Sequence, residues 1–429
     1  MSAPKLRFKE FDGDWSASEL GKLIGISSAS RVFKEQWQDS GVPFFRTSDV
    51  SAFFKNKENE KAYISFDLFE ELAKKSGKIK KDDLLVTGGG SIGIPYLVPN
   101  NEPLYFKDAD LLWFKSSGII EGSFLYNFLI SSKFREYLNS ISHTGTISHF
   151  TIEQAKTTPF KLPSKEEQTK IASFLSAVDQ KISQLTQKHA LLAQYKQGMM
   201  QKLFSQQIRF KADDGSEFGE WEVKTLIDSI DTNIKWSFTG GPFGSNLKSD
   251  DYTESGIRII QLQNIGDGSF LNDYKIYTSL KKADELLSCN IYPNEILISK
   301  MGDPVARCCI VPNHHERYVM CSDGIRLVVD KKRYSHLFMF YQINYQDFRQ
   351  SASDVSTGST RKRIGLSDLK QLPIKAPCLE EQTKIANFLS AIDQKIGVVA
   401  QQIEQAKMWK KGLFDPRQNN GQHVPLKIT

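Results

Sequence analysis

Long or hydroxylated hydrogen-bonding side chains recur in both halves of the chain, close to short apolar runs. Arginine can bind the O6 and N7 atoms of guanine, asparagine and glutamine can bind adenine, and serine, threonine and lysine suit phosphates, so these residue types match a DNA duplex. They are equally typical of solvated loops, and residue type alone leaves both interpretations open. The candidate DNA-binding residues of the first half are Arg46, Thr47, Ser48, Thr144, Thr146 and His149. Those of the second half are Ser245, Asn246, Lys248, Gln261, Gln263, Asn264, Thr357, Ser359, Arg361, Lys362 and Arg363.

The sequence lacks the common cofactor-binding motifs, and although single carboxylate clusters of the nuclease type stay open, none repeats at matching positions of the two halves. Gly88, Gly90 and Gly93 have the GxGxxG spacing of a dinucleotide site, but Pro95 follows where the phosphate-binding helix would run. We therefore interpret this run as a tight turn. The ATP-binding pattern GxxxxGK[ST] is absent, as are the glycine-rich and Asn/Asp-Pro-Pro-aromatic motifs of nucleic-acid methyltransferases. We expect a non-catalytic chain that binds no metal and no cofactor.

Cysteine usage and charge distribution narrow the class of protein further. All five cysteines lie in the second half without a CxxC pair, which predicts buried reduced thiols rather than disulfides or zinc. The net charge is +6, and most of the surplus falls in two helical segments, so net charge alone does not indicate nucleic-acid binding. No apolar run is long enough for a membrane span. We expect a cytoplasmic protein.

One stretch of seventeen residues occurs twice, and the rest of the chain is arranged around it. Residues 166–182 and 380–396 agree at fifteen of seventeen positions and differ only at Ser173/Asn387 and Val178/Ile392. Such agreement at a constant offset of 214 residues indicates an internal duplication.

Each copy predicts the start of a long helix, because apolar residues recur at alternating steps of four and three. The two apolar seams are expected to pack on each other as a coiled coil. The seam residues are Ile171, Leu175, Val178, Ile182, Leu185, Ile385, Leu389, Ile392, Ile396 and Val399. Lys196 and Lys410 also fall on the seams, and we expect them to weaken the coiled coil. Ser164 and Glu167 have the spacing of a capping box.

The globular segments correspond to each other as well. Residues 41–50 lie opposite 256–265, as an apolar strand that runs out into polar residues, and 82–87 lie opposite 294–299, as a buried strand. The predicted fold class is α+β, with two mixed α and β domains related by an internal pseudo-twofold repeat. The predicted segments are 1–163 for the first globular domain, 164–206 for the central helix, 207–376 for the second globular domain, 377–415 for the C-terminal helix, and 416–429 for a flexible tail.

The start of each helix shows one detailed pattern of proline, Glu-Gln, apolar and acidic residues. It is formed by Pro163, Glu167, Gln168, Ile171, Leu175, Asp179 and Ile182, and again by Pro377, Glu381, Gln382, Ile385, Leu389, Asp393 and Ile396. A Gly-Pro-Phe-Gly-Ser-x-Leu-Lys run occupies 241–248. With the order globule, helix, globule, helix, this pattern resembles the specificity subunits of type I restriction-modification systems.

The resemblance implies a non-catalytic subunit with two target recognition domains, each of which reads one half of a bipartite, asymmetric site in double-stranded DNA. It further implies that two antiparallel helices set the spacer between the half-sites and dock two methyltransferase subunits. Those partners would supply S-adenosylmethionine chemistry, and restriction or translocase subunits would use ATP and magnesium. The alternative from another class is a structural coiled-coil adaptor that binds protein only.

Overall fold

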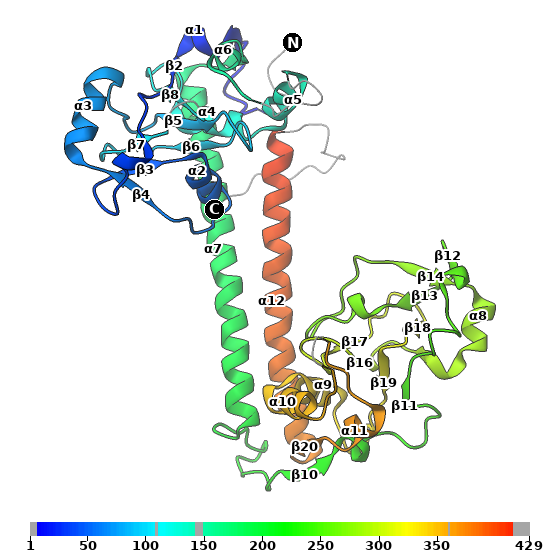
Figure 1. Ribbon diagram of the computed structural model, residues 1–429. Coiled ribbons are helices and arrows are strands. Elements are labelled where there is room, and N and C mark those ends of the chain that lie inside the picture. The colour runs from blue at the N-terminus through cyan, green and yellow to red at the C-terminus, as the bar shows by residue number, and fades with distance from the viewer. Residues whose placement is uncertain (1–6, 108–109, 142–148, 359–360, 415–429) are drawn as a thin grey trace. The chain divides into compact units, whose positions relative to one another are not determined.

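The computed structural model describes residues 7–107, 110–141, 149–358 and 361–414, with side chains as far as residue 410 (Figure 1). The chain forms two compact units. Unit 1 contains Met1–Thr186 and Gln401–Thr429, and unit 2 contains Gln187–Ala400. Each unit therefore combines one globular part with portions of both long helices, α7 (Lys165–Phe204) and α12 (Leu379–Phe414). This grouping differs from the five consecutive segments that the sequence suggested.

Unit 1 contains two small sheets and a two-stranded ribbon. The larger sheet has the order β2-β8-β5-β6 and is antiparallel throughout, with β2 at Gly25–Ser27, β8 at Leu111–Lys115, β5 at Leu84–Thr87 and β6 at Pro95–Leu97. The other has the order β4-β3-β7, with β4 at Ala62–Ile64, β3 at Val42–Phe45 and β7 at Tyr105–Phe106. The ribbon pairs β1 (Ser16–Glu19) with β9 (Pro159–Leu162). The helices are α1 (Leu20–Leu23), α2 (Thr47–Phe54), α3 (Phe66–Ser76), α4 (Gly122–Leu129), α5 (Ser132–Ile141) and α6 (Ile152–Lys156).

Unit 2 repeats this plan with longer connections. Its antiparallel sheet has the order β11-β19-β16-β17, with β11 at Phe238–Gly240, β19 at Gly324–Leu327, β16 at Ile296–Ser299 and β17 at Cys308–Ile310. Its mixed sheet has the order β12-β14-β13-β18-β15, with β12 at Tyr252–Thr253, β14 at Ile276–Thr278, β13 at Ile257–Ile260, β18 at Tyr318–Met320 and β15 at Asn290–Ile291. A ribbon pairs β10 (Glu222–Thr225) with β20 (Pro373–Ala376). The helices are α8 (Leu280–Glu285), α9 (His336–Asn344), α10 (Gln346–Asp354) and α11 (Leu366–Lys370).

The matching strands β5 and β16 form the centre of each antiparallel sheet. Their sequences, LLVT and ILIS, are buried at every position, because both faces of the strand are covered. The matching strands β3 and β13 each pair with one parallel and one antiparallel neighbour. The correspondence of 82–87 with 294–299 and of 41–50 with 256–265 is therefore confirmed.

The two long helices run antiparallel and pack through their apolar seams. In unit 1 the start of α7 meets the end of α12, where the rings of Phe174 and Trp409 lie 5.2 Å apart. In unit 2 the end of α7 meets the start of α12, whose Ile385 and Leu389 are fully buried. Packing within the chain buries six of the ten seam residues and half-buries the other four, Ile171, Ile182, Leu185 and Ile396. The coiled-coil role of the seams is thus visible in the structure, whereas docking of a partner on these helices stays a prediction.

The seam lysines form ion pairs across the helix pair. Lys410 Nζ lies 2.7 Å from Asp179 Oδ2 in unit 1, and Lys196 Nζ lies 2.6 Å from Asp393 Oδ1 in unit 2. These pairs are equivalent, because both lysines and both aspartates are separated by 214 residues. The duplication therefore places one Lys–Asp ion pair in each unit.

The Glu-Gln pair at the start of each long helix holds the globular part on that helix. Glu167 is buried, and its carboxylate accepts hydrogen bonds from Arg7 Nε at 2.6 Å and from Trp15 Nε1 at 3.1 Å. Gln168 accepts from the Glu121 amide at 2.8 Å and donates to the Pro163 carbonyl. Glu167 thus does not complete the capping box, although the Ser164 hydroxyl accepts from its amide as predicted.

Unit 2 contains the same arrangement with one contact fewer. Arg209 donates to both carboxylate oxygens of the buried Glu381, at 3.1 and 2.6 Å. Gln382 accepts from the Ser335 amide at 3.0 Å and donates to the Pro377 carbonyl. The Trp221 indole N–H, however, has no hydrogen-bond partner among the described residues. The identical motif therefore anchors two different globular parts.

The cysteines match the expected reduced state with one exception in burial. Cys289, Cys308, Cys309 and Cys321 are free and buried, whereas Cys378 is free but exposed at the start of α12. Burial raises the pKa of Cys308 to about 12 and that of Cys321 to about 11. Among the described helices, none combines the length and the apolar character needed to cross a membrane.

Candidate nucleic-acid interface

In unit 2 the turn from Cys321 to Gly324 brings together most of the predicted DNA-binding segments. The Cys321 amide donates to the carbonyl of Ile260, the last residue of β13, at 2.9 Å. The amide of Gly241 donates to the Gly324 carbonyl at 2.8 Å. The residues after β13 and the loop 241–248 consequently start from the same turn.

Further hydrogen bonds join the basic segment 361–363 to this turn. Lys300, which follows β16, donates its amide to the Asp323 carbonyl at 2.7 Å and accepts from the Ile364 amide at 3.0 Å. The Arg363 guanidinium donates to Asp323 Oδ1 at 2.6 Å. The backbones of Thr357 and Arg363 exchange hydrogen bonds of 2.9 and 2.8 Å. We refer to the Cys321–Gly324 turn and the segments bonded to it as the unit 2 frame.

Unit 1 contains an equivalent frame, built from equivalent backbone hydrogen bonds. Lys107 donates its amide to the Phe45 carbonyl at 2.8 Å, where β3 ends. Gly88, which follows β5, donates to the Asp110 carbonyl at 2.8 Å and accepts from the Phe150 amide at 2.8 Å. Matching these bonds to those of unit 2 makes His149 the counterpart of Arg363. The unit 1 frame therefore comprises the end of β3, Lys107, Asp110 and the residues next to Gly88 and Phe150 that the structure describes.

The glycine-rich run 88–93 is a turn between β5 and β6, as predicted. Gly90 and Gly93 have φ values of +68° and +71°, which glycine adopts without strain. Arg135 donates to the carbonyls of Ile92, at 2.8 Å, and of Gly93, and so fixes the turn. The turn lies beside the imidazole of His149, because a Cβ on Gly89 would be 3.6 Å from that ring. A Cβ there would make an ordinary contact with the ring but would lie only 3.1 Å from Asp110 Oδ1, so the closest neighbour of this glycine is the Asp110 carboxylate.

Arg46 is used largely within unit 1. Its guanidinium donates to Asp49 at 2.8 Å, bonds the Glu60 carbonyl and lies over the Trp37 ring. Burial would raise the pKa of Asp49, but hydrogen bonds from the Arg46 side chain and amide outweigh it and leave that pKa below its usual value. Arg46 is consequently a poorer candidate for a base contact than its residue type suggested.

Gln261 and Asn264 occupy the positions of Arg46 and Asp49. The Gln261 amide donates to Asn264 Oδ1 at 2.9 Å, just as the Arg46 amide donates to Asp49 Oδ2 at 2.8 Å. Asn264 is fully buried, and its Nδ2 donates to the carbonyls of Leu271 and Tyr274. The prediction that Asn264 contacts DNA is therefore contradicted, because both ends of its amide are used inside the unit.

The remaining predicted residues divide by exposure. The hydroxyl of Thr47 donates to the Asp110 carbonyl, and that of the exposed Ser48 accepts from Asn59. Exposed residues at or next to the two frames are His149, Ser245, Asn246, Lys248, Gln263, Thr357, Arg361, Lys362 and Arg363. The predicted residues Thr144, Thr146 and Ser359 lie outside the described residues.

Two basic residues of the unit 2 frame escaped the sequence-based prediction. Lys300 lies at the frame through the amide bonds given above. Arg307 donates to the carbonyls of Ile265, at 2.7 Å, and Leu262, and so supports the short turn that carries Gln263. The correspondence of β5 with β16 could have identified Lys300, because Lys300 is the residue directly after β16. Unit 2 thus has more basic groups at its frame than unit 1.

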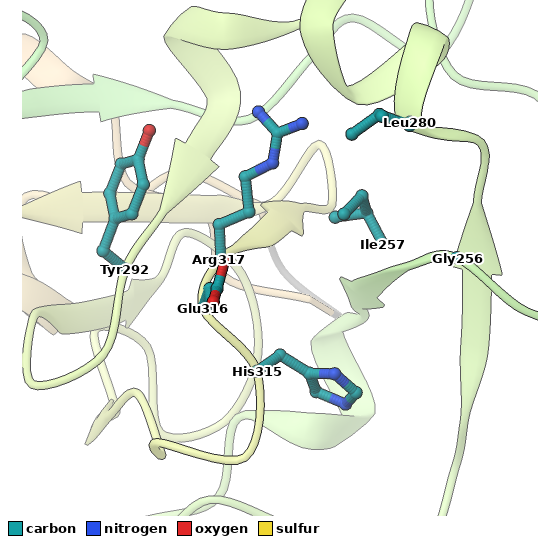
Figure 2. Close-up of a pocket in the computed structure, with 7 residues that line it drawn as sticks. All are labelled: Gly256, Ile257, Leu280, Tyr292, His315, Glu316 and Arg317. Carbon is teal, nitrogen blue, oxygen red and sulfur yellow. The ribbon is translucent and has the colours of Figure 1, made fainter.

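A hollow in unit 2 lies at the opposite end of β13 from the frame. It has a volume of about 570 Å³ and is lined in part by Gly256, Ile257 and Arg317. Figure 2 shows the Arg317 guanidinium between Tyr292 and Leu280. That guanidinium lies 2.6 Å from Asp284, so its charge is already paired. The hollow lies at the first residue of β13, Ile257, whereas the predicted DNA-binding residues come after the last residue of that strand, Ile260.

In the described part of the chain, no group of three or more histidine, cysteine or acidic residues is placed to hold a metal ion. The two frames instead present turns with amide, hydroxyl, imidazole and guanidinium groups. Such groups bind phosphates and base edges.

Comparison with known proteins places this arrangement in a family. The family model described as "Type I restriction modification DNA specificity domain" matches residues 12–194 and 244–408. The MjaVIII and putative MjaX type I restriction enzyme specificity subunits of Methanocaldococcus jannaschii are 27% and 26% identical to this chain. The alignments cover 95% and 96% of it and 94% of each relative. The crystal structure of a type I S subunit from M. genitalium shares the fold, with a TM-score of 0.56 at 17% identity over 96% of this chain and 98% of that one. The chain therefore belongs to the type I restriction-modification DNA specificity family, whose members recognise the DNA sequence in these systems.

Proposed function

We propose that units 1 and 2 each read one half of a bipartite, asymmetric DNA site. The observation that carries this proposal is that both units use the same backbone frame but present different side chains from it. His149 stands where Arg363 stands, and Gln261 stands where unit 1 has Arg46, whose guanidinium is bonded within its own unit. Because imidazole, guanidinium and amide groups prefer different base edges, equivalent positions with different side chains select different sequences.

The exposed faces of α7 and α12 support the docking of two copies of one methyltransferase subunit. Within the duplicated stretch, five positions are exposed in both copies and identical in both, although packing within the chain does not require those side chains. They are Glu166/Glu380, Thr169/Thr383, Ala177/Ala391, Gln180/Gln394 and Lys181/Lys395. A repeated exposed surface fits two identical partners related by a pseudo-twofold axis.

In this proposal the chain supplies recognition and its partners supply chemistry. The methyltransferase subunits would bind S-adenosylmethionine, and restriction or translocase subunits would use ATP and magnesium. The chain would act in the cytoplasm as a non-catalytic recognition subunit. A coiled-coil adaptor that binds protein only would not need two exposed frames with different side chains.

Sequencing that reports adenine methylation tests the bipartite reading. Genomic DNA from a host that expresses this chain with its methyltransferase subunit should carry one methylated two-part motif with a fixed spacer. Insertion of whole helical turns within 183–203 of α7 should change the spacer and leave both half-sites the same. A motif without a gap, or methylation by this chain alone, would contradict the proposal.

Charge reversal on the helices tests the docking of two partners. Lys181→Glu and Lys395→Glu should each remove one methyltransferase copy from the complex, and the double variant should remove both, as measured by native mass spectrometry. Ser173→Asn is the matched control, because it gives an exposed position of the first copy the residue of the second. Loss of both copies from either single variant would argue against separate docking sites.

A further inference from the structure

Phe243 is the most exposed large apolar residue of unit 2 among the described residues. Its exposed fraction is 82%, compared with 38% for Trp236 and 45% for Tyr274 in the same unit. No aromatic partner lies against its ring in the described part of the chain, and it belongs to no core cluster. Exposure of a whole phenyl ring gives up the free energy of burial, so a ligand that covers the ring regains it.

The loop that carries Phe243 is firmly attached to the unit 2 frame. Gly241 donates its amide to the Gly324 carbonyl, and a Cβ on Gly241 would collide with the Cys321 carbonyl oxygen. On the far side of Phe243, the Asn246 amide donates to the Phe243 carbonyl at 2.8 Å, and the Lys248 amide donates to Asp251 at 2.8 Å. Since Leu247 also packs against the cluster that contains Ile259 and Val319, the loop is attached to unit 2 on both sides of the exposed ring.

The surroundings of the ring are polar rather than apolar. Ser245, Asn246 and Lys248 are all exposed within the same loop. A protein groove would require a wider apolar patch around the ring, because single exposed apolar residues bury too little area to dock a partner. A stack of bases bordered by phosphates offers an apolar slot with polar edges, which matches one ring among hydroxyl, amide and ammonium groups.

The corresponding loop of unit 1 is different. It leaves β2 as the loop of unit 2 leaves β11, and it ends at Phe33, whose amide donates to Gln36 at 2.9 Å, as the Lys248 amide donates to Asp251. Phe33 is 56% exposed, and the Arg31 guanidinium lies over its ring. An uncovered ring on the longer loop is thus a property of unit 2.

We propose that Phe243 inserts its ring between two base pairs of the half-site read by unit 2 and unstacks that step. This inference rests on the proposed function, because it requires that unit 2 binds a DNA duplex through its frame. Insertion of an apolar wedge opens and bends the duplex, and the sequences that deform most easily are then favoured. Phe243 would thereby contribute to the choice of half-site without a hydrogen bond to a base.

Fluorescence of 2-aminopurine, which rises when the base loses its stacking, tests the insertion. The full chain assembled with its methyltransferase subunit is titrated with duplexes that carry 2-aminopurine at successive positions of the methylated motif. Wild-type complex should raise the fluorescence at one step of one half-site. Phe243→Ala should abolish that rise and weaken binding about 5- to 150-fold, as removal of a base-stacking aromatic does. Phe243→Leu, which keeps an apolar wedge, should retain part of the rise.

The controls separate this inference from the proposed function. Val223→Ala removes an exposed apolar residue of the same unit on β10, away from the loop, and should bind like wild type. Sequence-specific binding by Phe243→Ala with unchanged affinity and fluorescence would overturn the insertion while the proposed function stands. Loss of the methyltransferase subunit from the Phe243→Ala complex would show instead that the ring docks protein, and this also overturns it. Failure of the wild-type complex to bind the motif would refute the proposed function itself.

Discussion

Units 1 and 2 share a backbone frame yet carry different side chains at several equivalent positions of it. The strand ends, the turn after β5 or β16 and the segment before β8 or β19 are joined by equivalent hydrogen bonds. His149 and Arg363 occupy equivalent positions, and so do Arg46 and Gln261. The comparison teaches that the exposed side chains of the frame can differ while its shape is kept, because the hydrogen bonds that the two units share run between backbone atoms.

The largest difference that we predict concerns the buried carboxylates at the helix starts. Arg209→Met leaves Glu381 buried without a cationic partner. We expect the free energy of unfolding to fall by about 3 kcal/mol. This is the low end of the range for a broken buried ion pair, because Arg209 is partly exposed. Arg7→Met should cost less, because the Trp15 indole still donates to Glu167, whereas the Trp221 indole does not reach Glu381. Chemical denaturation of the full chain measures both variants.

A double variant of unit 1 provides the control for this comparison. Trp15→Phe in the Arg7→Met background should remove the remaining donor and bring unit 1 down to the loss seen in unit 2. Equal losses from the two single arginine variants would show that the indole contributes nothing, and the asymmetry between the units would then be unsupported.

The second prediction sets Arg363 against His149 in DNA binding. Arg363→Ala should weaken binding to the full site by about 2 kcal/mol and relax specificity in one half-site only, if the guanidinium contacts a base edge. His149→Ala should affect the other half-site and by less, because imidazole offers fewer donors. Binding assays on duplexes mutated in one half-site at a time measure both effects. A uniform loss over all sequences would assign Arg363 to phosphate, and loss in the same half-site for both variants would contradict separate reading.

Much of the fold could be predicted because the chain is internally duplicated, so that each pattern occurs twice. The seams of α7 and α12, the strands β3, β5, β13 and β16, and the order of globules and helices all follow from periodicity and repetition. The ion pairs between the helices did not follow, because a lysine on an apolar seam stabilises or destabilises according to what lies opposite. Which side chain lies opposite depends on the relative direction of the two helices. Here the aspartates opposite the lysines, Asp179 and Asp393, are 214 residues apart in the sequence.

The candidate site could be predicted only in part, because residue type does not reveal whether a polar group is already used. Asn264 and Arg46 have the chemistry of base-reading residues, yet hydrogen bonds within their own units occupy them. Lys300 lies at the frame but was missed, since it follows a buried strand rather than a polar run. Phe243 was noticed only as part of a motif, because exposure of an apolar ring is a property of the folded chain.

A third prediction compares the two helix ion pairs. Asp393 accepts from the Tyr341 hydroxyl at 2.7 Å in addition to pairing with Lys196, whereas Asp179 pairs with Lys410. Asp393→Asn should therefore destabilise the chain by about 1 kcal/mol, and Asp179→Asn by less, since partly exposed pairs contribute little. Thermal denaturation gives the order. Tyr341→Phe should add little in the Asp393→Asn background, and full additivity would show that the two side chains are not coupled.

The smallest predicted effect is a dependence on pH that the Asp49 cap of unit 1 should show and the equivalent Asn264 cap of unit 2 should not. Asp49 and Asn264 cap equivalent turns, but only the carboxylate titrates. The folded-state pKa of Asp49 lies below its unfolded value, so its contribution to stability is complete above the unfolded pKa and is lost as pH falls through the folded pKa. Urea denaturation between pH 6 and about pH 3, below the ordinary aspartate pKa of about 3.9, should show a steeper fall for wild type than for Asp49→Asn. Asp39→Asn, at an exposed carboxylate of unit 1, should leave the slope unchanged. Equal slopes for wild type and Asp49→Asn would mean that the hydrogen bonds from Arg46 do not favour the charged form, and the two caps would then be alike in their electrostatics as well as in their backbone.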